Sequence, residues 1–90
     1  MTLFRKVEYV FNISRRGCVI VPVALSGADF KIRRKDQIQL RTPGGRVLDT
    51  RIASIELLKP QDGSACRMAI MLPRDLVKQD VPIGTEVWLL

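Results

Sequence analysis

The chain has no histidine and only two cysteines among its 90 residues. The missing histidine excludes a histidine general base, a Ser-His-Asp triad and a histidine metal site. Cys18 and Cys66 are too few for a disulfide scaffold and, without histidine, too few for a zinc site. Both cysteines lie in apolar runs, which indicates buried, reduced thiols of the kind found in the cytoplasm.

Long apolar runs and phosphate-binding motifs are also missing. The longest apolar run, residues 18–25, is interrupted by Pro22 and is far shorter than the ~20 residues of a membrane span. The first residues do not have the pattern of a secretory signal, so we expect a cytoplasmic protein without a membrane partner. The pair Gly44-Gly45 lies in a hairpin turn and is not followed by a helix, which excludes a P-loop. Together these absences predict a binding module without catalytic activity and without a cofactor.

Basic residues are in clear excess, with 15 lysines and arginines against 9 acidic residues and a net charge of +6. The excess lies in the first 51 residues, because residues 52–90 hold four bases and five acids. Arginine forks bind phosphates and carboxylates well, so a polyanion or an acidic protein surface is a reasonable partner. The candidate nucleic-acid-binding residues are Arg15, Arg16, Lys31, Arg33, Arg34, Lys35, Arg41, Arg46 and Arg51.

Apolar residues alternate with polar ones along most of the chain, a period typical of half-buried strands. Strands are expected at residues 7–13, 18–21, 37–41, 47–58, 66–72 and 86–90, and a helical turn is expected within residues 73–80. The segment 47–58 is expected to form one long strand or a bent one. Turns are expected at residues 26–29, 42–45, 59–64 and 82–85. These short connections predict one all-β domain over residues 1–90, a small closed antiparallel β-barrel of about six strands. The predicted core residues are Val7, Tyr9, Phe11, Ile13, Val19, Val21, Ile38, Leu40, Ile55, Met68 and Ile70.

Four segments in order carry a resemblance to a known family. A strand ending in Phe11-Asn12-Ile13 leads to an Arg15-Arg16-Gly17 tip and a valine-rich strand, and residues 32–40, 50–58 and 69–87 follow the same family pattern. The chain resembles, over nearly its whole length, the second domain of translational GTPases of the elongation factor Tu type. The resemblance implies a small β-barrel that contacts RNA or the ribosome. Arg15 and Lys35 stand where the family has glycine, and the GTPase domain and third barrel are missing, so no nucleotide hydrolysis is implied.

A second, shorter resemblance covers residues 12–17. Asn12, Ser14 and Gly17 match the Asp/Asn-x-Ser-x-x-Gly motif of PilZ domains, which bind cyclic diguanylate, but the upstream Arg-x-x-x-Arg motif of that family is missing. The leading hypothesis is therefore a module that binds RNA or a ribosome-associated protein through its basic surface. The alternatives are a protein-interaction or oligomer-forming barrel without nucleic acid, and a PilZ-like cyclic diguanylate-binding domain.

Overall fold

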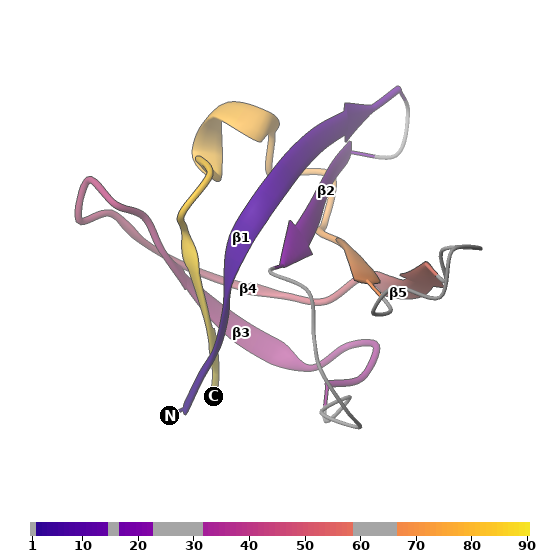
Figure 1. Cartoon of the computed structure of the whole chain (residues 1–90), viewed down its shortest axis with the longest axis horizontal. Helices are drawn as coiled ribbons and strands as arrows, with labels where there is room; N and C mark the ends of the chain where they lie inside the picture. Colours follow the sequence, from indigo (N-terminus) through magenta and orange to yellow (C-terminus); the bar gives the residue numbers. More distant parts are fainter. Residues whose placement is uncertain (1, 15–16, 23–31, 59–66) are drawn as a thin grey trace.

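The computed structural model describes residues 2–14, 17–22, 32–58 and 67–90. Seven antiparallel strands form one sheet in the order β4-β3-β7-β1-β2-β6-β5, and the sheet curls into an open half-barrel (Figure 1). The elements are β1 (Thr2–Ile13), β2 (Gly17–Pro22), β3 (Gln37–Arg41), β4 (Val47–Arg51), β5 (Ser54–Leu58), β6 (Arg67–Met71), the 3-10 turn η1 (Lys78–Asp80) and β7 (Glu86–Leu89). The described part of the chain contains no helix with the length and hydrophobicity of a membrane span.

The predicted all-β, antiparallel class is confirmed, but strand pairing does not close the sheet within the described residues. β4 and β5 stand at the two ends of the strand order and do not pair with each other. They follow one another in the chain, so residues 47–58, predicted as one long strand or a bent one, form two strands on either side of a bend. Ile52 exchanges backbone hydrogen bonds with Lys35 and Asp36, whereas the Ala53 N–H donates to the Met71 carbonyl. The chain changes partner at this bend, which separates one long apolar run into two strands.

β1 is the central strand of the sheet. It pairs with β7 through its first half and with β2 through its second half. The pairing shifts by one residue between Leu3 and Arg5 and again between Val7 and Tyr9, so β1 carries two β-bulges. Each bulge inserts an extra residue and interrupts the alternation of faces. As a result the buried residues of β1 are three apart: Phe4, Val7 and Val10.

The bulges overturn part of the predicted core. Tyr9, Phe11 and Ile13 were expected to face inward with Val7, but they are 45%, 50% and 42% exposed. The second bulge lies between Val7 and these residues, so they point to the outer face of the sheet. Val10 takes the inward position instead.

The rest of the predicted core is close to what the structure contains. Val7, Ile38, Leu40, Met68 and Ile70 are buried in one apolar cluster on the inner face, and Ile55 is half-buried against it. Val19 and Val21 are buried but stand outside that cluster, because they pair with the outward-facing Phe11 and Tyr9. The run Cys18–Val21 is therefore buried on both faces, as its continuous apolar sequence predicts.

Two predicted turns and the helical turn are also found. In the 42–45 turn the Gly45 N–H donates to the Thr42 carbonyl over 3.0 Å, and in the 82–85 turn the Thr85 N–H donates to the Pro82 carbonyl over 3.1 Å. The expected helical turn is η1. The turns expected at residues 26–29 and 59–64 lie outside the described residues. The two ends of the chain lie side by side (Figure 1), because Thr2 pairs with Leu89.

Candidate functional site

A tight turn before β3 presents three of the predicted site residues together. The Asp36 carboxylate accepts the Arg33 N–H over 2.8 Å, and the Asp36 N–H donates to the Arg33 carbonyl over 3.1 Å. The side chains of Arg33, Arg34 and Lys35, which we call the basic turn, are all exposed. Lys35 has a φ of 74° and its N–H donates to the Ile52 carbonyl. The acidic residue of this segment thus holds the backbone, and the three cations face solvent.

A fourth predicted site residue lies beside the basic turn. Arg51 ends β4 opposite Gln37, the first residue of β3, and is exposed. Within the described residues no ion pair engages Arg51 or the basic turn. The structure therefore brings four of the nine predicted cations to one end of the β3–β4 ribbon.

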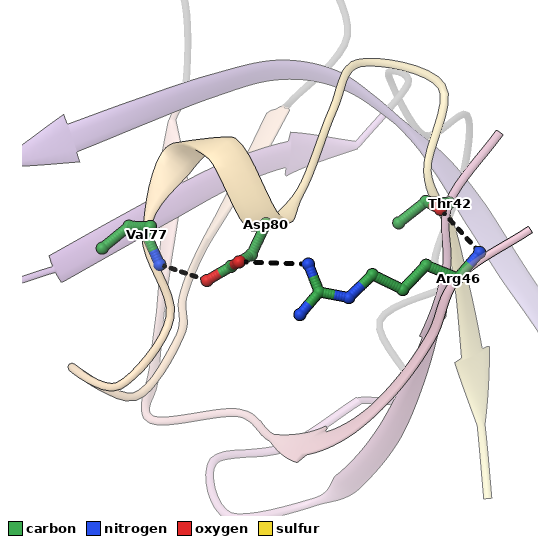
Figure 2. Close-up of polar contacts among 4 residues, drawn as sticks. All are labelled: Thr42, Arg46, Val77 and Asp80. Carbon is green, nitrogen blue, oxygen red and sulfur yellow. Dashed lines mark hydrogen bonds and ion pairs between the residues drawn. The ribbon is translucent and has the colours of Figure 1, made fainter. Parts of the chain in front are cut away.

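Arg41 and Arg46 lie at the opposite end of that ribbon and are held by other groups. The Arg41 guanidinium lies 4.2 Å above the centre of the Trp88 ring, and its Nε donates to Gln39 Oε1 over 2.8 Å. Arg46 forms an ion pair of 3.3 Å with Asp80, whose other carboxylate oxygen accepts the Val77 N–H (Figure 2). The predicted basic surface is thus divided into two groups. The remaining candidates, Arg15, Arg16 and Lys31, lie outside the described residues.

The outer face of β1 carries a second candidate surface that the sequence interpretation assigned to the core. Tyr9, Phe11 and Ile13 form an exposed row that we call the apolar stripe. The rings of Tyr9 and Phe11 stack with their centroids 6.3 Å apart and their planes 22° apart. Val21 and Val19 lie directly opposite these two residues on β2 but are buried, so the exposed apolar row belongs to β1. The alternation in the sequence correctly placed these three residues on one face of the strand. It did not show that this face points outward.

The stripe ends at a hollow beside the β1–β2 connection, which we call the tip groove. Its volume is about 790 Å³, and its floor and walls come from the ends of β1 and β2 and from the segment before η1. The Asn12 side-chain oxygen accepts the Lys78 N–H over 2.9 Å and joins β1 to η1. The lining residues are Asn12, Ile13, Ser14, Gly17, Arg74, Leu76 and Val77.

No three His, Cys, Asp or Glu side chains gather into a metal site in the described ranges. Burial raises the pKa of the Cys18 thiol, and the nearby Asp80 carboxylate raises it further, so this thiol stays protonated and unreactive near neutral pH.

Comparisons with protein-family models, with curated proteins and with solved structures found no match to this chain. Function is therefore inferred from the surfaces themselves.

Proposed function

We propose that the protein is a non-enzymatic binding module for RNA or a ribonucleoprotein, and that it contacts phosphates through the basic turn and Arg51. The observation that carries the proposal is the turn at residues 33–36, where one carboxylate fixes the backbone and three consecutive cations face solvent. Side chains arranged in this way neutralise successive phosphates of a flexible strand and release its counterions. A contact set of this kind gives affinity with little sequence preference.

The resemblance to the second domain of elongation factor Tu-type GTPases supports this proposal. The family has glycine where this chain has Lys35, and Lys35 adopts the left-handed φ of 74° that favours glycine. The register of the resemblance thus agrees with the backbone at a conformationally demanding position. Lysine accepts some strain there and adds a charge to the basic turn.

The same resemblance leads us to propose a closed barrel, in which the chain between β4 and β5 joins the two edges of the sheet. β4 and β5, at the two edges of the sheet, are separated by Ile52 and Ala53 alone. Ile52 is hydrogen-bonded to the segment before β3, and Ala53 is hydrogen-bonded to β6. A bent strand over residues 47–58 would then form both edges of the sheet, with β4 at one edge and β5 at the other. The reduced thiols expected from the sequence favour the cytoplasm as the place where this module acts.

The test is a titration of the purified protein with single-stranded RNA and with structured RNA at several salt concentrations. The double variant R33A/R34A removes two charges from the basic turn, and R74A/K78A removes two charges from exposed residues elsewhere. We expect R33A/R34A to weaken binding to all sequences alike and to flatten the salt dependence by roughly 0.7 per lost contact on single strands. The control pair should change the affinity much less.

Two results would overturn the proposal. Equal losses in both double variants would mean that net charge alone attracts RNA. A wild-type dissociation constant no tighter than about 0.1 mM at physiological salt would place the protein at the weak end of non-specific association.

A further inference from the structure

The apolar stripe on the outer face of β1 adjoins the tip groove at the end of that strand. Ile13 belongs to both, since it ends the stripe and lines the groove. Beyond it, Val77 is 47% exposed and Leu76 is buried below it. An apolar surface that runs from a stacked aromatic pair into a hollow is typical of a binding site and not of a solvated exterior.

One cation lines the groove, and a second lies close to it in the chain. Arg74 lines the groove, and the Lys78 N–H is bonded to Asn12 on the groove wall. Both side chains are exposed, and within the described residues neither has an ion pair. Asp80 is the acidic residue closest in sequence to Lys78, but its carboxylate is occupied by Arg46 and the Val77 N–H (Figure 2).

The neighbouring acidic residue does not neutralise the groove either. Asp75 follows Arg74 in the chain, but it lines a different hollow, together with Gln37, Thr50 and Arg51. The groove therefore combines the aliphatic side chains of Ile13, Leu76 and Val77 with polar side chains and with the positive charge of Arg74. This combination is complementary to a ligand that carries both apolar side chains and carboxylates.

We propose that the apolar stripe and the tip groove dock an acidic segment of a partner protein, with apolar side chains against Phe11 and Ile13 and carboxylates at Arg74 and Lys78. This interaction is separate from RNA binding at the basic turn. A second copy of this chain is a poorer occupant, because each copy carries a net charge of +6. RNA bases are also poorer occupants, because aliphatic side chains form the groove end of the surface and offer no flat ring for stacking.

The test uses three labelled peptides of equal length and fluorescence anisotropy. One alternates leucine and glutamate, one alternates leucine and lysine, and one alternates glycine and glutamate. The surface combines apolar and basic groups, so the first peptide should bind at least about tenfold more tightly than either of the others, a difference of about 1.4 kcal/mol. Equal binding of the leucine-lysine peptide would show unspecific hydrophobic adhesion and overturn the proposal.

Paired variants locate the binding. Phe11→Ser alters the stripe, and Leu3→Ser alters another exposed apolar residue of β1, 41% exposed, outside the stripe. Phe11→Ser and R74A/K78A should each lower the affinity for the leucine-glutamate peptide about tenfold or more. Leu3→Ser and R33A/R34A should leave that affinity unchanged. Circular dichroism and thermal unfolding confirm that each variant is folded.

Three outcomes contradict the proposal and leave RNA binding at the basic turn as a separate question. Equal effects of Phe11→Ser and Leu3→Ser would show that the stripe is not the contact. Conversion of a dimer to a monomer by Phe11→Ser in sedimentation would assign the stripe to a second copy. Loss of RNA affinity in Phe11→Ser, with no peptide binding by the wild type, would make the stripe a base-stacking surface.

Discussion

The outer faces of the two halves of the sheet have opposite character. Over β3, β4 and β7, a row of side chains is joined by polar contacts, which we call the polar row. Gln39 donates to Asp49 over 3.0 Å and accepts from Arg41, Arg41 covers the Trp88 ring, and the Trp88 indole N–H donates to Glu86 over 3.1 Å. These contacts link the outward-facing side chains of β3, β4 and β7 to one another.

The outer face of β1 instead exposes a row of apolar side chains. Tyr9 and Phe11 stack on each other, and Ile13 continues the row into the tip groove with about half of each side chain exposed. Apolar surface gains free energy when it leaves water, at roughly 25 cal/mol per Å². The polar row therefore contributes to stability through its own contacts, whereas covering the apolar stripe would remove apolar area from water and add to it.

The largest expected effect comes from placing a charge on either side of β1. Val10 is 6% exposed and packs in the core, while Phe11, the next residue, is 50% exposed. Val10→Asp should unfold the domain, because an unpaired buried charge costs several kcal/mol and a domain of this size has only about 5 kcal/mol to lose. Phe11→Asp should lose about 0.5–1.5 kcal/mol, the value of an aromatic contact. Urea unfolding followed by circular dichroism measures both changes.

The opposite ranking would contradict the bulged register of β1. If Phe11→Asp unfolded the protein and Val10→Asp did not, the alternation of faces would run through Tyr9 and Phe11 without interruption. That outcome would also remove the apolar stripe from the surface.

The same strand shows how far the sequence can be read. The period-two pattern correctly predicts that residues 7–13 form a strand and that Tyr9, Phe11 and Ile13 share a face. It cannot predict which face, because a single extra residue at a bulge exchanges inside and outside. Nothing in the residues around Glu8 marks a bulge, since neither glycine nor proline is present there.

The division between β4 and β5 has the same kind of cause. Residues 47–58 have a strand composition throughout. The chain bends where Ile52 is hydrogen-bonded to Lys35 and Asp36 and the next residue, Ala53, is hydrogen-bonded to Met71, all distant in sequence. Local composition predicts the strand type, but long-range pairing decides where it ends. For the candidate site, charge clustering marked the basic turn. The tip groove instead involves Arg74, which lies in a segment with no net positive charge.

An intermediate effect is expected where η1 joins the two halves. Asp80 binds Arg46 of the β3–β4 hairpin, and Lys78 binds Asn12 of β1 (Figure 2 shows the Asp80 side). Asp80→Ala should lower the free energy of unfolding by about 1 kcal/mol, because the Val77 N–H loses its acceptor. Arg46→Ala should cost about 0.5 kcal/mol or less, since 60% of the Arg46 side chain is exposed and solvent screens the pair. Urea titration of the two variants checks the order, and a larger loss for Arg46→Ala would contradict it.

The smallest expected effect concerns Cys18, on the inner face of the apolar half. Burial, and then the Asp80 carboxylate, raise the thiol pKa of Cys18 in the folded protein above its ordinary value of 9.0. The unfolded chain therefore releases this proton at a lower pH than the folded one. The stabilisation is fully present below pH 9.0 and is lost as the pH rises through the folded pKa, with a slope of at most about 1.36 kcal/mol per pH unit.

Tyrosine and lysine side chains titrate in the same alkaline range, so the measurement compares slopes between wild type and Cys18→Ala. Stability is measured by urea unfolding under reducing conditions at several pH values from 8 to 10. Cys18→Ala lowers the overall stability because it leaves a small cavity, but its decline with pH should be shallower than that of the wild type. Parallel declines would show that the thiol ionises equally in both states, in which case burial of Cys18 would not hold its proton.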